Sequence, residues 1–320
     1  MKNIYLFLFN LLLILSPVLV YGSEKTADNK KGLKTIRILA IGNSFSDDAV
    51  EHYLYGLAKD AGVEIVIGNM YIGGCSFETH WKNASTDAPA YEYRKIDADG
   101  NKTVTKDKKI SEALVDETWD FISFQQASPT SGMYYTYEKD MPELYDYVLA
   151  NNPNKKTKYI LHQTWAYASN STHKGFANYD NNQIKMYYAI CDAVKRASKL
   201  RKFDIIVPSG TAIQNARTSF IGDNMCRDGY HLDLNIGRYT ASCTWFEKVT
   251  GKNVIGNKYA PEALSPIEIE IAQNAAHMAV KKPFEVTRMV NYNERTVPLL
   301  ETVPEVAWTT IPQFATAPCL

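Results

Sequence analysis

Three side chains that could together perform nucleophilic catalysis lie in two distant parts of the sequence. Ser44 follows a short apolar run, residues 36–41, and a serine hydroxyl there can act as a nucleophile or cap the helix that follows. His231 comes three residues after Asp228, a spacing at which a carboxylate can orient an imidazole and stabilise its charged form. Because such pairs arise readily by chance in a chain with 35 acidic residues, the position of this pair in the fold has to give it weight.

N–H groups that could bind an oxyanion follow two further apolar runs. The second of two adjacent glycines, Gly74, comes after residues 63–67; such a pair lets the backbone approach a reacting group, and it also forms ordinary tight turns. Gln125 and Gln126 follow residues 119–124, where their amides could donate to an oxyanion or bond neighbouring loops. A serine nucleophile with oxyanion donors is one interpretation of this pattern.

Most of these candidates follow a β-like run, and the β-like runs alternate with helical ones. The β-like runs are residues 36–41, 63–67, 119–124, 158–161 and 203–207, and the helical ones are 47–61, 138–149, 183–199, 234–250 and 266–280. Short apolar runs separated by helices of a dozen or more residues indicate βαβ units and a parallel sheet. We therefore predict an α/β fold in which the candidates meet at the carboxyl ends of the strands, where ligands bind in such folds.

We expect residues 1–22 to be a cleaved export signal. Lys2 precedes an apolar run, residues 4–20, and a Val-Tyr-Gly sequence ends the segment, which is typical of a signal peptide. The run is short for a transmembrane anchor and contains a proline. The mature protein is therefore expected to be periplasmic or extracellular, with no stable membrane span once the signal is removed.

The rest of the chain is expected to form one domain. We predict a flexible segment at residues 23–34, an α/β domain at residues 35–285 and a tail at residues 286–320 that wraps the domain. An Ala-Asp-Gly-Asn turn between β-leaning flanks predicts a hairpin inserted near residues 91–106.

The composition argues against two classes of partner. The chain has 35 basic and 35 acidic side chains, so it lacks the basic surplus with which a nucleic-acid-binding protein neutralises phosphates. Its six histidines and five cysteines include no Cys-Xaa-Xaa-Cys pair and no His-Glu-Xaa-Xaa-His motif, the spacings that commonly bind zinc. We therefore expect no nucleic-acid partner, no metal and no cofactor.

Taken in chain order, the motifs resemble those of the SGNH, or GDSL-type, hydrolase superfamily. The resemblance spans about residues 36–250 and is to an exported bacterial branch of that superfamily. The motifs that carry it are Ile41-Gly-Asn-Ser-Phe-Ser46, Ile72-Gly-Gly-Cys-Ser76, Phe124-Gln-Gln-Ala-Ser128, His162-Gln-Thr-Trp165 and Asp228-Gly-Tyr-His-Leu232. The resemblance implies a three-layer α/β/α, flavodoxin-like fold with a central, mainly five-stranded parallel sheet. It also implies that Ser44 is the nucleophile, His231 the general base and Asp228 the carboxylate that orients it.

The same resemblance implies an oxyanion hole with one altered member. The backbone N–H groups of Ser44 and Gly74 match two of the superfamily's donors. The superfamily usually has Gly-Xaa-Asn-Asp at the third block, and this chain has no such asparagine. Because related carbohydrate esterases use a glutamine in this region, the resemblance implies Gln126, or else Gln125, as the third donor.

The activity implied is ester hydrolysis through an acyl-enzyme, with no metal or organic cofactor. Polar and aromatic side chains near strand ends are candidates for substrate contact: His80, Trp81, His162, Gln163 and Trp165. Export and this polar lining favour removal of acetyl or other short acyl groups from a small-molecule or polysaccharide carbohydrate ester. Two alternatives stay open, namely a lipase- or arylesterase-type hydrolase and a non-catalytic glycan-binding protein on a degenerate hydrolase scaffold.

Two cysteines lie beside the expected catalytic elements. Cys75 follows Gly74, and Cys226 lies two residues before Asp228. Since the fold would bring these loops together in an oxidising compartment, Cys75 and Cys226 are a candidate disulfide.

Overall fold

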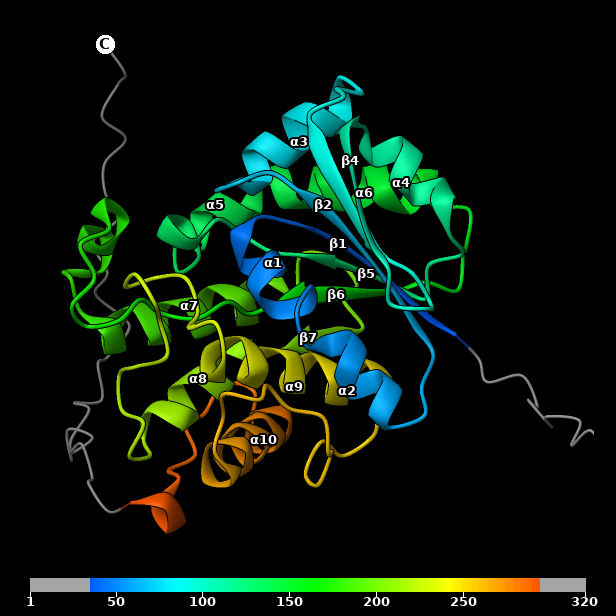
Figure 1. The fold of residues 1–320 in the computed structure, drawn as a ribbon. Coiled ribbons are helices and arrows are strands. Elements are labelled where there is room, and N and C mark those ends of the chain that lie inside the picture. The colour runs from blue at the N-terminus through cyan, green and yellow to red at the C-terminus, as the bar shows by residue number, and fades with distance from the viewer. Residues whose placement is uncertain (1–34, 294–320) are drawn as a thin grey trace, which may run out of the picture. The chain divides into compact units, whose positions relative to one another are not determined.

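A computed structural model describes residues 35–293 (Figure 1). The expected export signal, the segment at residues 23–34 and most of the expected tail, residues 294–320, lie outside the described residues. In the described part of the chain, no helix is both long enough and apolar enough to cross a membrane.

A seven-stranded sheet forms the centre of the fold. Its strands are β1 (Ile36–Gly42), β2 (Ile65–Tyr71), β3 (Tyr91–Ile96), β4 (Lys102–Lys108), β5 (Phe121–Phe124), β6 (Lys158–His162) and β7 (Ile205–Val207). They lie in the order β4-β3-β2-β1-β5-β6-β7. The five strands from β2 to β7 in this order are parallel, whereas β3 and β4 form an antiparallel hairpin on the β2 edge, in the range of the predicted insertion.

The central strand β1 brings the functional loops together. It pairs in parallel with both β2 and β5, so that Ile38 lies opposite Ile67 on one side and Phe121 on the other. Its residues from Ile38 to Ile41 are at most 1% exposed, because helices cover both faces of a parallel sheet. The carboxyl ends of β1, β2 and β5 consequently meet at one edge.

Helices form the two outer layers. They are α1 (Ser44–Val50), α2 (Leu54–Asp60), α3 (Phe77–Ser85), α4 (Ile110–Asp116), α5 (Tyr135–Glu138), α6 (Asp140–Asn151), α7 (Gln183–Ala197), α8 (Ser209–Arg217), α9 (Ile236–Thr250) and α10 (Pro266–Lys281), with 3₁₀ turns η1 (Ser128–Thr130), η2 (Lys174–Tyr179) and η3 (Val290–Tyr292). Helices α3, α4 and α6 lie on one side of the sheet, and α1, α2 and α9 lie on the other, with α10 packed outside α8 and α9 (Figure 1). The predicted three-layer α/β/α fold with a five-stranded parallel core is confirmed, and its strand order is flavodoxin-like.

The helix predicted at residues 47–61 is two helices, because the chain breaks where Glu51 turns inward. The Glu51 side chain is 1% exposed, and its Oε1 accepts a hydrogen bond from Asn69 Nδ2 at 2.6 Å. Helix α1 also begins earlier than predicted, since the Asn43 side chain caps it by accepting the Phe45 N–H at 3.0 Å. Ser44 is therefore the first residue of α1.

Candidate active site

Ser44, His231 and Asp228 form a continuous chain of hydrogen bonds. Ser44 Oγ lies 2.9 Å from His231 Nε2, and His231 Nδ1 lies 2.6 Å from Asp228 Oδ2. Because a carboxylate only accepts, the imidazole carries its proton on Nδ1 and its Nε2 accepts the serine hydroxyl. The structure thus brings together the three residues that the sequence placed in these roles.

The loop that carries Asp228 and His231 is fixed by its own carboxylate. Asp228 Oδ1 accepts the backbone N–H groups of Tyr230 at 3.1 Å and His231 at 2.8 Å. Between them, Gly229 has φ +89°, and a Cβ there would lie 2.9 Å from Ser171 Cα, so only glycine fits. Partial burial alone would raise the pKa of Asp228, but the hydrogen bonds from His231 and Tyr230 outweigh it and lower that pKa. Asp228 therefore stays ionised as the partner of the imidazole.

Buried hydrogen bonds hold the turn between β1 and Ser44 in place. Asn43 is 1% exposed, and its Oδ1 accepts Gln125 Nε2 at 2.7 Å in addition to the Phe45 N–H. Its Nδ2 donates to the Cys75 carbonyl at 3.0 Å, which joins the loop after β1 to the loop after β2. Ser44 itself is half-buried, so its hydroxyl remains open to a substrate.

Two backbone N–H groups are available for an oxyanion. Among residues 35–293, neither the Ser44 N–H nor the Gly74 N–H has a hydrogen-bond acceptor. Gly74 is exposed, with φ +66°, and the bond from Asn43 to Cys75 keeps its loop beside Ser44. They are the two backbone donors expected from the sequence, and their role stays a prediction.

The third donor predicted from the sequence is wrong. Both N–H bonds of the Gln126 amide are in use, because Nε2 donates to the carbonyl and the hydroxyl of Thr136 at 3.1 and 3.0 Å. Gln125 is 2% exposed and acts one step away, through its bond to Asn43. Of the expected donors, the backbone N–H groups of Ser44 and Gly74 are therefore the ones left without an acceptor among residues 35–293.

A buried carboxylate, Asp48, connects the helix of Ser44 to the loop of His231. Asp48 is 0% exposed and accepts the Leu232 N–H at 2.8 Å. It also accepts Arg238 Nε at 2.7 Å and Arg227 Nη1 at 3.0 Å, and that guanidinium in turn donates to the Leu232 carbonyl. Asp48 is not among the residues predicted from the sequence, although its place four residues after Ser44 puts it one helical turn away.

Asp47, Asp48 and His52 have ligand atoms within 4.8 Å of one another, the only such group of three that the described residues contain. Guanidinium groups already lie against both carboxylates, since Arg94 is 3.5 Å and Arg238 3.9 Å from Asp47. Burial alone would raise the pKa of Asp47, but His52, Arg238 and Arg94 outweigh it and lower that pKa to about 2. The cluster is a network of ion pairs rather than a cation site.

Four of the residues predicted to contact substrate are buried, so those predictions are wrong. His80, His162, Gln163 and Trp165 are at most 2% exposed, and Trp81 is half-buried against Tyr147 on α6. The residues occupy the interior because helices cover the sheet from both sides. Burial lowers the pKa of both His80 and His162 to about 3, so both rings are neutral.

Trp165 contacts the residues next to Ser44 and His231. Its ring stacks on Phe45 with centroids 4.2 Å apart and an angle of 5°, and its Nε1 donates to the Tyr230 carbonyl at 2.8 Å. Phe45 follows Ser44, and Tyr230 precedes His231. Trp165 therefore positions both sides of the Ser44–His231 contact.

The candidate disulfide is also wrong, because Cys75 and Cys226 are free thiols. Cys226 Sγ accepts a hydrogen bond from Arg217 at 3.6 Å, and the Cys75 backbone carbonyl binds Asn43. Neither contact joins the loop of Cys75 to the loop of Cys226. Burial raises the pKa of Cys75 to about 12 and that of Cys226 to about 11.

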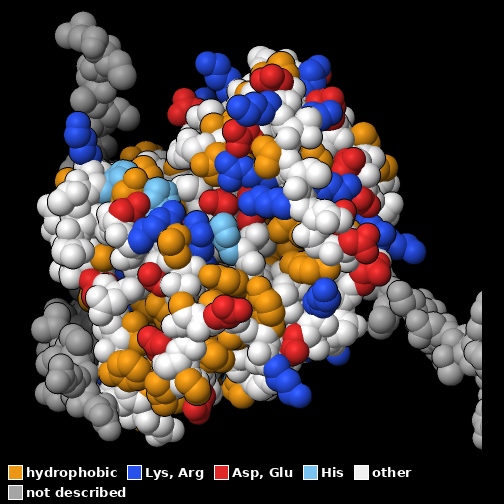
Figure 2. Space-filling view, in the orientation of Figure 1, with side chains coloured by type: hydrophobic (Ala, Val, Ile, Leu, Met, Phe, Trp, Pro, Cys, Tyr) orange, Lys and Arg blue, Asp and Glu red, His pale blue; other side chains and the backbone are white. Residues whose placement is uncertain are grey.

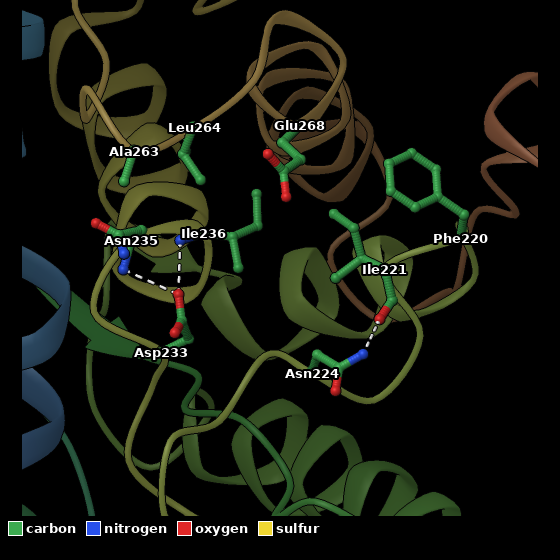
Figure 3. Close-up of a pocket in the computed structure, with 9 residues that line it drawn as sticks. All are labelled: Phe220, Ile221, Asn224, Asp233, Asn235, Ile236, Ala263, Leu264 and Glu268. Atoms are coloured by element: carbon green, nitrogen blue, oxygen red, sulfur yellow. Dashed lines mark hydrogen bonds between the residues drawn. The ribbon is translucent and has the colours of Figure 1, made fainter.

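A cavity of about 400 Å³ lies between the loop after α8 and the first turns of α9 and α10 (Figure 3). It is lined by Phe220, Ile221, Asn224, Asp233, Asn235, Ile236, Ala263, Leu264 and Glu268. Two of its polar side chains already have partners, since Asp233 accepts the N–H groups of Asn235 and Ile236, and Asn224 donates to Ile221. Hydrophobic side chains gather over this lower part of the molecule, whereas charges of both signs alternate above it (Figure 2). Ser44, His231 and Asp228 are not among the residues that line the cavity.

The fold and the site together define an α/β protein of flavodoxin-like topology with a Ser–His–Asp chain at the carboxyl edge of its sheet. The chain belongs to the family described as a domain of unknown function, DUF4886, whose model matches residues 37–279. No curated protein matches the chain.

Solved structures include one similar protein from the same family. It is a DUF4886 family protein from Bacteroides uniformis ATCC 8492, 56% identical, with a TM-score of 0.80 over 81% of this chain and 100% of that one. More distant similarity is found to TesA, at 12% identity and a TM-score of 0.43 over 67% of this chain and 98% of TesA. Similarity is also found to Axe2, an acetylxylan esterase from Geobacillus stearothermophilus, at 12% identity and a TM-score of 0.44 over 67% of this chain and 94% of Axe2.

Proposed function

We propose that the protein is a serine esterase that works through an acyl-enzyme. The observation that carries this proposal is the unbroken chain from Ser44 through His231 to Asp228, with contacts of 2.9 and 2.6 Å. A half-buried serine whose hydroxyl donates to an imidazole nitrogen is positioned to lose its proton as it attacks a carbonyl. Asn43, and not Ser44, caps helix α1, so the Ser44 hydroxyl is not needed as a helix cap.

Each group has a role in two successive steps. His231 Nε2 takes the Ser44 proton as Oγ attacks the ester carbonyl, and Asp228 stabilises the imidazolium that forms. The N–H groups of Ser44 and Gly74 bind the developing oxyanion. His231 then gives its proton to the leaving alcohol, and in the second step it activates a water that releases the acid.

The preferred substrate that we propose is an acetyl or other short acyl ester of a carbohydrate. Support comes from the surface around the triad, because segments 42–46, 72–75 and 228–231 contain none of the large hydrophobic residues that the described part of the chain exposes. A long acyl chain would need an apolar surface beside Ser44. Short acyl groups on a polar alcohol need none.

We further propose that the protein acts outside the cytoplasm, as the sequence of residues 1–22 suggests. Periplasmic or extracellular polysaccharides would then be within reach. N-terminal sequencing of the protein secreted by its own host would begin at Ser23 if the signal is cleaved as expected, and at Met1 if it is not.

The activity is tested with nitrophenyl esters of increasing acyl length and with acetylated glycans. We expect hydrolysis of the acetyl ester by the wild type and its abolition in Ser44→Ala. Ser85→Ala is the matched control, because Ser85 is an exposed serine on α3. Preference for long acyl chains would support a lipase-type hydrolase. No hydrolysis of any ester, together with binding of glycans, would support the non-catalytic alternative.

A further inference from the structure

Two half-buried aromatic side chains continue outward from the catalytic histidine. The ring of Tyr230 lies 4.1 Å from the ring of His231, measured between centroids. The ring of His173, at the start of η2, lies 4.8 Å from that of Tyr230, and the buried Tyr167 ring lies 5.0 Å from that of His173. His231, Tyr230 and His173 thus form a row of rings that leads away from Ser44.

The row presents two hydrogen-bonding groups with no partner in the described part of the chain. His173 Nδ1 accepts the Gly175 N–H at 3.0 Å, so a neutral His173 carries its proton on Nε2. Partial burial, and then the charge of His231, lower the pKa of His173, which keeps the ring neutral. No hydrogen bond within residues 35–293 uses His173 Nε2 or the Tyr230 hydroxyl. Each is therefore free to bind a ligand.

The mechanism determines which part of a substrate reaches this row. His231 Nε2 must protonate the leaving alcohol, so the alcohol oxygen has to lie within hydrogen-bond distance of that nitrogen. The body of the alcohol then extends over the groups that flank His231. The acyl group, by contrast, lies between Ser44 and Gly74, whose N–H groups bind its carbonyl oxygen.

We propose that Tyr230 and His173 form the binding subsite for the leaving alcohol and select alcohols that carry further hydroxyl groups near the ester, as a sugar ring does. The Tyr230 hydroxyl can donate and accept, and His173 Nε2 donates, which suits neighbouring hydroxyls on a ring. A simple alkyl alcohol would leave both groups unpaired on binding. The inference rests on the proposed esterase activity and specifies its alcohol.

The test compares three acetyl esters in the full-length protein: a monoacetylated methyl pyranoside, its analogue without the neighbouring hydroxyls, and methyl acetate. We expect the wild type to have a higher kcat/KM for the pyranoside than for its deoxy analogue. Tyr230→Phe keeps the ring and removes only its hydroxyl. His173→Phe keeps a ring but removes Nε2–H together with Nδ1, which accepts the Gly175 N–H. Each should lower kcat/KM for the pyranoside roughly 3- to 10-fold, the value of one neutral hydrogen bond, and should lower it less for the deoxy analogue.

The matched control is Tyr55→Phe, which removes a tyrosine hydroxyl at the other edge of the sheet, where it donates to Ala98 in the turn between β3 and β4. It should leave the ratio between the pyranoside and its analogue unchanged. Equal losses on all three esters in Tyr230→Phe and His173→Phe, or a wild type without preference for the hydroxylated alcohol, would overturn the subsite while leaving the esterase proposal intact. No hydrolysis of any ester by the wild type would overturn both.

Discussion

Replacing Asp48 with alanine should loosen the contact between the helix of Ser44 and the loop of His231. Its fully buried carboxylate accepts the Leu232 N–H, Arg238 Nε and Arg227 Nη1. The change leaves two guanidinium groups without this counter-charge and one buried N–H without an acceptor. Breaking a buried ion pair costs about 3–5 kcal/mol. The Arg227 and Arg238 side chains are 30% and 13% exposed, so water can hydrate the unpaired guanidinium groups and offset part of this cost. We therefore expect a loss of about 3 kcal/mol in the free energy of unfolding.

Asp48→Ala should also lower the rate of ester hydrolysis, independently of its effect on stability. The loop that Asp48 binds carries His231, whose Nε2 must stay within 2.9 Å of Ser44 Oγ. A displacement of about 1 Å in a reacting group costs on the order of 100-fold in rate. Asp48→Asn retains an oxygen that can accept the Leu232 N–H, so it should lose less activity than Asp48→Ala, while losing the charge that both arginines bind.

The assay pairs urea unfolding with hydrolysis of nitrophenyl acetate at a temperature where every variant is folded. Asp192→Ala is the control: Asp192 pairs with Arg196 at 3.3 Å, but their side chains are 42% and 50% exposed, and such a pair contributes less than about 1 kcal/mol. If Asp48→Ala unfolded at the wild-type urea concentration, or kept the wild-type kcat, the positioning role of Asp48 would be refuted.

Three further outcomes are expected. Asp228→Asn should lower kcat for acetyl esters by roughly 10³- to 10⁴-fold because the imidazole loses the partner that fixes its tautomer; a kcat within tenfold of wild type would contradict the triad. Asp47 has its pKa lowered from 3.8 to about 2 in the folded state, so its ionised form stabilises the protein by about 2 kcal/mol above pH 4, and this is lost as the pH falls towards 2; urea unfolding of Asp47→Asn should show that loss already at pH 7 and a shallower decline below pH 4. Because burial raises the pKa of Cys75 to about 12 and of Cys226 to about 11, iodoacetamide at pH 8 should alkylate both in the unfolded, unreduced protein and neither in the native one within minutes; mass spectrometry of the peptides checks this, and a Cys75–Cys226 linked peptide would contradict the structure.

The parallel sheet could be predicted because apolar runs buried on both faces are visible in sequence. The apolar pattern predicts the second strand at residues 63–67, whereas β2 is Ile65–Tyr71. Its later part includes Asn69, a polar residue that is 0% exposed and that binds Glu51 and Ser46. A polar side chain at a buried strand position conceals the strand, since its partners lie elsewhere in the chain.

Helix α8 shows a second limit of sequence patterns. All nine of its residues are buried, because α9 and α10 cover the side that would otherwise face water. Helices are recognised by alternation between an apolar and a polar face, and a helix without an exposed face has no such alternation. The missing signal is therefore a consequence of packing.

The grouping of Ser44, Asp228 and His231 could be predicted because it follows from the order of their motifs along the chain. The oxyanion and substrate roles depend instead on the direction in which each side chain points. Gln126 and Gln125 are adjacent, yet one amide bonds Thr136 and the other bonds Asn43. His162 meets Trp245 of α9, whose Nε1 lies 3.3 Å from its Nε2. No local pattern contains a partner that is 83 residues away.

The buried polar residues at the strand ends hydrogen-bond to one another, and this internal network explains why they resemble a binding site in the sequence. His162 Nδ1 donates to Gln125 Oε1 at 2.8 Å, and Gln125 Nε2 donates to Asn43 Oδ1 at 2.7 Å. His162 Nε2 then accepts the Ser209 hydroxyl at 2.9 Å, which requires the neutral ring that burial produces by lowering the pKa of His162 to about 3. A directional chain of hydrogen bonds therefore runs from α8, through β6 and β5, to the residue before Ser44. The glutamine and histidine at the strand ends hold the turn before Ser44 in place from inside the fold, and we expect substrate to bind around His231 instead.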